Sequence, residues 1–395
     1  MTAPPMTRRH LVGMSLGAAT TVAATGFIGC DAAKEASPSD SGPPPPPREG
    51  EDFVPVNVSA DREIRTVVGL RPYRPSGFVV RREDLAGKIL VHNYGHGGGG
   101  MSLSWGSAQL ALDLAQPVQG RDCAVLGAGV MGLSVAHLLQ LQGSRVHLYA
   151  QALPPDTTSN ASGAQWWPFS VFDPSRRTPA FAAQYLAAAK FAYQYFQPFV
   201  GPEWGVRWLP NYYLSEESPR NGWIGGPGGV LHDLQVGFRD FAPGEHVFSS
   251  GYARHFHTMM IEPATYLRRL FESVREAGAT IEIRAFAEAA EVFALPQSLI
   301  FNCCGLGAGA LFGDSEIRPI KGQLTFLLPQ PEVNYNLLSG DLYMFPRQDG
   351  ILLGGTYESG EWSTEPDPEA RVRILAAQQR LFQGMAARQR ERMPG

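Results

Sequence analysis

The spacing of apolar residues changes several times along the middle of this chain. Residues 123–126 form a short, unbroken apolar run of the kind expected for a buried strand, and a glycine-rich segment follows at once. Residues 133–139 carry apolar side chains at helical spacing, and Gly143 ends that segment. Residues 145–150 form a second strand-like run. The pattern predicts strand, glycine turn, helix and strand within about thirty residues.

Other segments predict further helices. Residues 104–114 and residues near 371–381 are each expected to be helical, and the Ala-rich run 179–196 is expected to form a buried helix. The adjacent tryptophans Trp166 and Trp167 are large apolar groups. They are expected in the core rather than in a binding pocket.

The glycine-rich segment has the spacing Gly-x-Gly-x-x-Gly. Gly127 allows a tight turn, Gly129 lets backbone N–H groups approach a pyrophosphate, and Gly132 lets the helix pack closely on the strand. The start of the helix adds unpaired N–H donors and a partial positive charge. The motif in this frame predicts dinucleotide binding. Gln151 stands where an acidic residue normally binds the ribose, which leaves that contact open.

The N-terminus has the features of an export signal. Arg8 and Arg9 form a twin-arginine pattern, and the uncharged residues 11–29 follow them. A short membrane anchor is the alternative interpretation. The residues that lead to Cys30 resemble a bacterial lipobox, with Phe27 where leucine is usual, and lipidation of Cys30 is left open.

A proline run follows the export signal. Residues 43–47 favour an extended, hydrated conformation that cannot build a core. We therefore expect a signal and lipobox at residues 1–30, a Pro-rich linker at 31–52 and one folded unit at 53–395. The protein is expected in a periplasmic or extracytoplasmic location, and it would touch a membrane only through a lipid at Cys30.

Charge and cysteine usage exclude several classes of protein. The net charge is −4 over 395 residues, and the folded unit has no Lys/Arg block, which argues against a nucleic-acid partner. The cysteines are Cys30, Cys123, Cys303 and Cys304, and the adjacent pair is poorly suited to an unstrained disulfide. The sequence therefore predicts neither a disulfide framework nor a bound metal.

Two more motifs stand upstream of the glycine turn. Residues 70–75 read Leu-Arg-Pro-Tyr-Arg-Pro, and residues 92–100 read His-Asn-Tyr-Gly-His-Gly-Gly-Gly-Gly. Together with the glycine turn and with residues 301–305, 321–323 and 353–355, they resemble the D-amino-acid oxidase family of flavoproteins. The resemblance extends over most of residues 60–385.

The order of these motifs differs from that of the family. In the family, the two upstream motifs come after the dinucleotide fingerprint. The resemblance therefore implies a circularly permuted chain, in which residues 51–61 lie near the last ten residues and Arg71 lies near the Gly97 loop.

The implied fold is α/β, with a Rossmann-like FAD-binding domain and a second, mostly antiparallel β-sheet substrate domain. The FAD-binding part is expected at about residues 86–168 and 281–318. The substrate part is expected at about residues 53–85, 169–260 and 319–395.

The resemblance also implies roles for individual residues. Arg71 matches the arginine that binds the substrate carboxylate, a role that suits its fork of donors; a structural ion pair is the alternative. Tyr343 matches a tyrosine whose hydroxyl contacts the same carboxylate, and Gly98 matches a glycine whose carbonyl faces the amine. His92 and His96 are expected to be structural.

A lid tyrosine of the family has no counterpart at the matching position. Ser339 stands there, and Tyr335 is the candidate replacement. The cofactor, FAD, is expected to contact residues from several separate segments. These residues are Gly97, Gly99, Gly100, Met101, Ser102, Gly127, Ala128, Gly129, Val130, Met131, Gly132, Gln151, Thr157, Thr158, Ser162, Gly163, Phe286, Cys304 and Gly305.

The activity implied by the resemblance is FAD-dependent oxidation of a D-amino acid. Hydride transfer to flavin N5 would give an imino acid that hydrolyses to keto acid and ammonia, with molecular oxygen as the electron acceptor and hydrogen peroxide as the second product. A glycine-oxidase-like amine oxidase or a quinone-linked D-amino-acid dehydrogenase is one alternative. A non-catalytic exported protein with a flavin fold is another.

Overall fold

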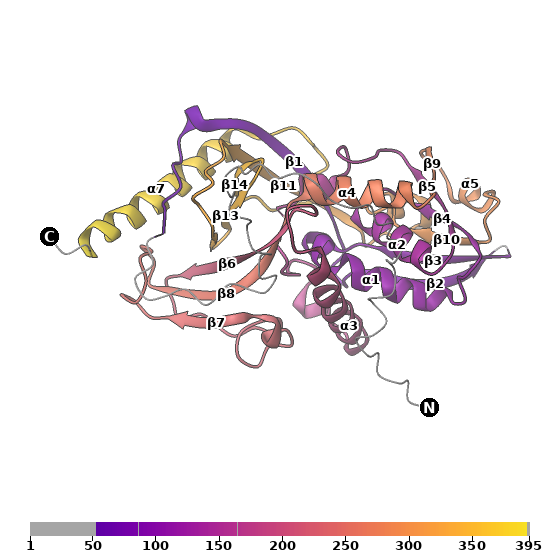
Figure 1. The fold of residues 1–395 in the computed structure, drawn as a ribbon, viewed down its shortest axis with the longest axis horizontal. Coiled ribbons are helices and arrows are strands. Elements are labelled where there is room, and N and C mark those ends of the chain that lie inside the picture. Colours follow the sequence, from indigo (N-terminus) through magenta and orange to yellow (C-terminus); the bar gives the residue numbers. More distant parts are fainter. Residues whose placement is uncertain (1–52, 86, 164, 393–395) are drawn as a thin grey trace, which may run out of the picture. The chain divides into compact units, whose positions relative to one another are not determined.

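Two β-sheets organise the part of the chain that the structure describes. The structure is a computed structural model, and it describes residues 53–85, 87–163 and 165–392. One sheet has nine strands and the other has six (Figure 1). The export signal, Cys30 and the proline run lie outside the described residues.

The six-stranded sheet contains the predicted glycine turn. In spatial order its strands are β2 (Val79–Leu85), β3 (Lys88–Tyr94), β10 (Leu299–Asn302), β4 (Asp122–Leu126), β5 (Arg145–Ala150) and β9 (Thr280–Ile283). From β3 to β9 the neighbours run parallel, whereas β2 runs antiparallel to β3. Along β4, Cys123 and Val125 join one core and Ala124 and Leu126 another. Both faces are therefore buried, which explains the unbroken apolar run.

Helices pack against both sheets. The α-helices are α1 (Gly100–Ala115), α2 (Val130–Leu141), α3 (Pro179–Phe196), α4 (Pro263–Glu276), α5 (Ala289–Phe293), α6 (Gly307–Phe312) and α7 (Pro368–Arg392). The 3-10 helices are η2 (Ala60–Arg62), η3 (Gly97–Gly99), η4 (Thr158–Ala161), η5 (Pro174–Arg176), η6 (Gln197–Phe199) and η7 (His232–Leu234). Helix α1 packs against α2 and α3, and α2 packs against α4.

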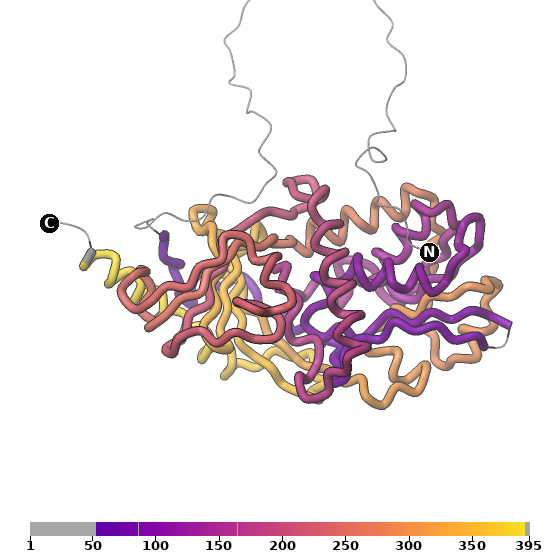
Figure 2. Tube along the Cα trace, turned by 90° about the horizontal axis from the view of Figure 1, so that it is seen from below, coloured from indigo at the N-terminus to yellow at the C-terminus, as the bar shows by residue number. Residues whose placement is uncertain are grey.

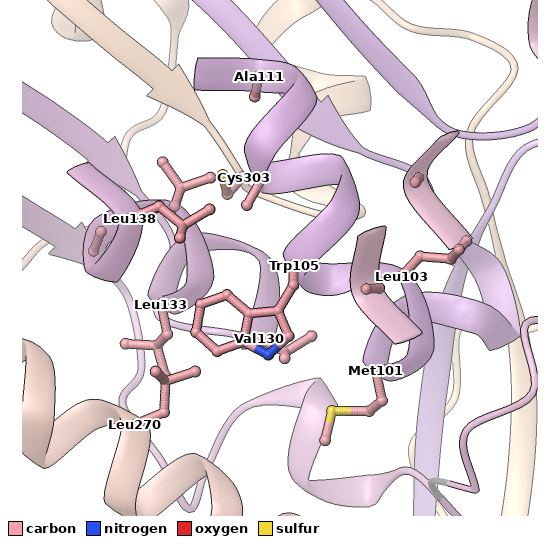
Figure 3. Close-up of a cluster of buried hydrophobic side chains, with 14 of the residues drawn as sticks. Met101, Leu103, Trp105, Ala111, Val130, Leu133, Leu138, Leu270 and Cys303 are labelled. Carbon is pink, nitrogen blue, oxygen red and sulfur yellow. The ribbon is translucent and has the colours of Figure 1, made fainter. Parts of the chain in front are cut away.

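Trp105 lies at the centre of this helical layer. It is fully buried, and its ring stacks on Phe199 with centroids 5.3 Å apart. Figure 3 shows its indole beside Val130 and Leu133 of α2, with Leu270 of α4 nearby. This core holds α2, and with it the glycine turn, against the sheet.

The nine-stranded sheet is mostly antiparallel. In spatial order its main path is β1 (Glu63–Tyr73), β11 (Arg318–Leu327), β14 (Gly350–Gly354), β13 (Leu342–Arg347), β12 (Asn336–Ser339), β6 (Val206–Ser215), β8 (Tyr252–Ile261) and β7 (Val236–Phe241), and β15 (Glu358–Ser359) pairs with β11. The pair β12–β6 is parallel. Helix α7 contacts β14 and β11, and its buried residues Ile374 and Phe382 join the core on that face.

The predicted fold class is confirmed. The strand–turn–helix–strand unit forms as β4, α2 and β5, and the second sheet is mostly antiparallel as expected. The helix at residues 179–196 forms as α3, but the prediction that it is buried is only half correct. Tyr185 and Ala188 are buried on one face, whereas Ala187 is exposed on the other.

The predicted boundary between the two parts needs correction near residue 86. Residues 79–85 had been expected in the substrate part, but they form β2 of the six-stranded sheet. Strands β2 and β3 follow each other closely, and Leu85 pairs with Lys88. Two strands joined by a tight turn pair with each other, so β2 belongs to the same sheet as β3.

The two ends of the described chain meet, as predicted. Gln389 Nε2 on α7 donates to the carbonyl oxygen of Phe53 (2.5 Å), and Arg371 forms an ion pair with Glu63. In Figure 2 the indigo start of the described chain lies near the yellow helix α7. Among the described helices, none has the length and hydropathy of a membrane span.

Candidate active site

A cavity of about 850 Å³ is lined by residues from both sheets. Its lining includes the turn between β4 and α2 and residues at the ends of β5 and β9. The lining also includes Arg71 on β1 and Tyr343 on β13. The cavity therefore joins a dinucleotide-type turn to a pair of polar side chains.

The turn after β4 has the geometry that its glycines predict. Gly127 has φ +103°, a conformation that favours glycine. A Cβ on Gly132 would lie 1.8 Å from the carbonyl oxygen of Gly127, so only glycine lets α2 start this close to β4. Gly127, Gly129 and Val130 line the cavity, and α2 begins at Val130. The positive end of the helix thus borders the cavity.

The upstream glycine loop lies beside the same cavity. Gly97 has φ +54°, and Gly98 N–H donates to the carbonyl oxygen of Ser170 (2.9 Å). A Cβ on Gly97 would lie 2.4 Å from that oxygen. Ser170 itself has φ +55°. The loop after Trp167 and the glycine loop therefore fix each other's backbone.

Most predicted cofactor residues line the cavity, but two do not. Gly132 is covered by the turn that it permits, and Gly99 packs on Val171, whose Cγ2 would lie 2.5 Å from an added Cβ. Both pack closely against the protein, and their contact with the cofactor stays a prediction. The predicted residues that line the cavity are Gly97, Gly100, Met101, Ser102, Gly127, Ala128, Gly129, Val130, Met131, Gln151, Thr157, Thr158, Ser162, Gly163, Phe286, Cys304 and Gly305.

Arg71 is positioned by the pairing of β1 with β11. Its guanidinium lies over Gly322, where an added Cβ would be 2.4 Å from Nη1. Nη1 is buried without a hydrogen-bond partner in residues 53–85, 87–163 and 165–392, and Nη2 lies 3.5 Å from Tyr343 Oη. Among the described residues no carboxylate forms an ion pair with Arg71. This arrangement disfavours the structural ion pair and leaves the charge available to an anion.

Tyr343 has a matching space on its neighbour strand. A Cβ on Gly354 would lie 2.0 Å from Tyr343 Cζ, so β14 must carry glycine there. Gly98 also lines the cavity, together with Arg71 and Tyr343. The three predicted catalytic residues are thus brought to one cavity, and their roles stay predictions.

Tyr335 does not replace the lid tyrosine. It is fully buried, and its hydroxyl donates to the carbonyl oxygen of Val54 (2.8 Å) in the core beneath α7. Leu338 pairs with Tyr343, and residues of opposite parity on β12 point to the other face. At the expected lid position, Gly340 and Asp341 alone connect β12 to β13.

His96 lines the cavity but is unsuited to act as a base. Burial lowers its pKa to about 3, and its ring stacks on Phe78 with centroids 4.5 Å apart. His92 is also buried, and burial lowers its pKa despite Glu83 nearby. The structure agrees with their expected structural roles. Burial raises the pKa of Cys304 to about 12, so its thiol stays protonated.

Several lining residues were missed at the sequence level. The missed residues with the clearest features are Gln165, Trp167, Phe169, Ser170, Arg284 and Trp362. Trp167 had been expected in the core; it is only 8% exposed, yet it lines the cavity. Trp166, its neighbour, is a core residue as expected. The proximity of Arg284 to the predicted Phe286 was the one available signal for Arg284.

Comparison with known proteins adds independent evidence. The family model "DAO: FAD dependent oxidoreductase" matches residues 122–394. The chain is 32% identical over 262 residues to a D-amino-acid oxidase from Streptomyces coelicolor, covering 64% of this chain and 75% of that protein. It is 31% identical over 263 residues to a D-amino-acid oxidase from Rubrobacter xylanophilus, covering 64% and 74%.

One solved structure also matches part of the chain. The glycine oxidase from Geobacillus kaustophilus matches with a TM-score of 0.49 and 14% identity, covering 68% of this chain and 80% of that chain.

The cavity fits FAD. The glycine turn with α2 behind it can hold the pyrophosphate, and the glycine loop offers a surface without side chains beside Met101 and Ser102. Gln151 lines the cavity at the end of β5 and can hydrogen-bond without charge. By these features and by the family match, which covers more than half of its length, the chain belongs to the DAO family of FAD-dependent oxidoreductases.

Proposed function

We propose that this flavoenzyme oxidises D-amino acids to imino acids, which hydrolyse to keto acids and ammonia, with oxygen as the electron acceptor and hydrogen peroxide as its product. The observation that carries the proposal is Arg71, whose buried Nη1 has no hydrogen-bond partner in the described part of the chain and whose Nη2 lies near Tyr343 Oη. Such a group suits a substrate carboxylate. The relatives named D-amino-acid oxidase support the choice of substrate.

The chain's own residues would bind and orient the substrate. Arg71 and Tyr343 would hold the carboxylate, and the carbonyl oxygen of Gly98 would accept a hydrogen bond from the amine. Bound FAD supplies the hydride acceptor. Three fixed contacts allow one enantiomer to present its α-hydrogen correctly. Such positioning can lower a barrier by roughly 7–11 kcal/mol in favourable cases.

A panel of D- and L-amino acids tests this proposal. Purified protein with bound FAD should lose its oxidised-flavin absorbance with D-amino acids under anaerobic conditions, and it should release peroxide in air. L-amino acids should do neither. If a D-amino acid bleaches the flavin without release of peroxide, and a quinone restores the absorbance of the oxidised flavin, the protein is a dehydrogenase. Absence of both responses would reject the proposed activity.

We infer that the chain is a circular permutant of the family. The family match begins at Asp122, the first residue of β4, while the Arg71 motif and the glycine loop precede it. Contact between Phe53 and α7 makes a joined ancestor sterically reasonable. A gene that starts at residue 122 and joins residue 392 to residue 53 through a Gly/Ser linker should yield a protein that binds FAD. Loss of FAD binding in that protein, beside a native control, would count against the inference.

We further propose twin-arginine export with a lipid anchor at Cys30. Residues 8–9 and the segment before Cys30 support it. Replacing Arg8 and Arg9 with lysine should retain the protein in the cytoplasm. Cys30→Ser should leave export intact and abolish lipid labelling. Unchanged export in the first variant would contradict the route, and unchanged labelling in the second would contradict the anchor.

A further inference from the structure

We propose that Gln165 determines substrate specificity, by accepting a hydrogen bond from an N–H or O–H donor near the end of the substrate side chain. The favoured substrates would be D-amino acids with side chains of the length of glutamine or lysine that carry such a donor. The inference rests on the proposed function, because it takes Arg71 and Tyr343 as the carboxylate site.

The Gln165 amide is buried in the cavity wall with one end unused. The residue is 5% exposed and lines the cavity. Its Nε2 donates to Tyr213 Oη (3.3 Å), whereas its Oε1 is buried without a hydrogen-bond partner among the described residues. A buried amide oxygen without a donor costs free energy that a ligand donor would recover.

The backbone of Gln165 is fixed on two sides. Its carbonyl oxygen accepts a hydrogen bond from Ser102 Oγ (3.2 Å) at the start of α1. The residue also forms a β-bridge with Met260 of β8. Because Ser102 belongs to the helix that follows the glycine loop, Gln165 is held in a defined place beside the expected flavin site. A rigid acceptor favours discrimination between ligands.

Three cross-strand neighbours connect the carboxylate site to Gln165. Tyr343 on β13 pairs with Leu338 on β12, and Leu338 pairs with Tyr213 on β6. Directly paired residues share a face, and adjacent strands lie about 4.8 Å apart, so the row spans roughly 10 Å. A substrate held by Arg71 and Tyr343 can therefore lay its side chain past Leu338 toward the Gln165 amide.

The walls of this path suit a carbon stem with a polar end. Leu338 and Trp167 both line the cavity and are mostly buried. Behind them, Phe256 packs on Trp167 (centroids 4.9 Å apart) and stacks on Tyr213 (5.8 Å). Burial raises the pKa of Tyr213, so its hydroxyl stays neutral. A carboxylate side chain would meet the acceptor oxygen of Gln165 and would be disfavoured.

Two unreactive acids test the inference without turnover. The first acid is glutaramate, the desamino analogue of glutamine. The second is the desamino analogue of methionine, which is similar in size but has no N–H donor at its end. Neither has an α-amine, so neither can be oxidised, and the flavin absorbance of the FAD-loaded protein reports their binding. The native protein should bind glutaramate at least about tenfold more tightly than the desamino analogue of methionine, and Gln165→Met should remove that preference.

Two further variants make the test sharper. Tyr213→Phe keeps the Gln165 amide but removes its hydrogen-bond anchor, so it should weaken the preference for glutaramate. This variant provides the test if Gln165→Met does not fold. Gln109→Met is the matched control, because Gln109 is half-buried on α1, does not line the cavity and donates a hydrogen bond to Asp113 (2.8 Å). It should keep the preference. The kcat/KM ratio of D-glutamine to D-methionine should change in parallel with the binding ratio.

Failure of this inference and failure of the proposed function give different results. Equal binding of the two acids, binding of neither, or a preference that survives Gln165→Met would overturn the role of Gln165. A preference that depends on Gln165 in a protein that oxidises no D-amino acid would support the acceptor and reject the proposed function.

Discussion

Two arginines of one motif have opposite environments. Arg74 forms ion pairs with Asp314 (2.7 Å) and Glu316 (2.8 Å), and Tyr94 Oη also donates to Asp314 (2.8 Å). Arg71 pairs with no carboxylate in the described chain and faces the cavity. The motif therefore combines a residue that ties the end of β1 to the loop after α6 with a residue whose charge has no carboxylate partner in the described chain.

Replacing each arginine with leucine should separate these roles. Arg71→Leu should weaken the binding of carboxylate substrates by roughly 2–4 kcal/mol, which would be measured as a raised KM. The free energy of unfolding should change little. Arg74→Leu should lower the free energy of unfolding by about 3 kcal/mol, because it removes the cation that Asp314 and Glu316 share at close range. Steady-state kinetics and urea unfolding on both variants check the pair. An Arg71→Leu enzyme with native KM would exclude it as the anchor.

Buried histidines predict loss of stability in mild acid. Burial lowers the pKa of His96 to about 3, and burial with His257 nearby lowers that of His255 to about 4. In the unfolded chain both would titrate near the ordinary value of about 6.5. Between these values the unfolded chain binds more protons, so the free energy of unfolding falls as pH falls. Above about pH 6.5 these groups have no effect.

Urea unfolding between about pH 7 and pH 5 measures this dependence. Each histidine contributes up to about 1.4 kcal/mol per pH unit within the window. A His255→Gln variant should show a shallower slope than the native protein. A flat native profile would contradict the assignment of neutral, buried histidines.

At the scale of elements, α1 and α3 pack at unusually short range through Gly106. A Cβ at this position would lie 1.8 Å from the carbonyl oxygen of Ala188 on α3. Helix α1 also carries Met101 and Ser102 at the cavity, so its position matters for the site. The close crossing therefore fixes both the core and the start of the helix that borders the cavity.

Gly106→Ala should be destabilising despite the small change. The two helices must move apart, which we expect to cost about 1–3 kcal/mol and to weaken FAD binding as α1 shifts. Gly222→Ala is the control, since nothing lies within 4 Å of an added Cβ there; its effect should stay within about 0.5 kcal/mol. Equal midpoints of urea unfolding for both variants would show that α1 tolerates the shift.

Helices and strands with a clear pattern of apolar residues could be predicted from the sequence, whereas the loop residues of the site could not. Strand β4 is buried on both faces and α2 follows a glycine turn, so local pattern defines them. Gln165 and Trp167 lie in a loop with no period, and contacts with Ser102 and β8 place them. Such contacts join residues far apart in the chain, and no local pattern reports them.

Strand parity explains why Tyr335 does not replace the lid tyrosine. Tyr335 is the candidate replacement for the lid tyrosine, and it lies four residues before Ser339. In a strand, successive side chains point to opposite faces, and Leu338 shares the face of Tyr343. Tyr335 is therefore on the far face, in the core under α7. The start of β12 must be known for this argument, and only the structure supplies it.

At the scale of the whole molecule, one ligand site joins both sheets. The cavity draws residues from β1, β11 and β13 of the larger sheet and from the β4–α2 turn of the smaller one. A cofactor bound in this cavity would lie between residues of both sheets, and the cavity exists only in the folded state. Binding should therefore stabilise the two sheets together.

Removing FAD should lower the stability of both sheets at once. At a free FAD concentration one hundred times its Kd, the gain should be about 2.7 kcal/mol. Thermal unfolding followed by far-UV circular dichroism and by tryptophan fluorescence should give one transition, which moves to lower temperature when FAD is stripped. Two transitions, of which only one responds to FAD, would show that the sheets unfold independently.

The pairing of Arg71 with Ile320 across β1 and β11 has a consequence for synthesis of the protein. The strand that carries the arginine leaves the ribosome early, but its partner strand is made only after the entire nucleotide-binding unit. The cavity wall extends in sequence from Val68 to Thr364. A chain that stops early cannot enclose the flavin, and such long-range pairing forms late in folding. The yellow colour of bound flavin should therefore appear only after the ribosome has completed the chain.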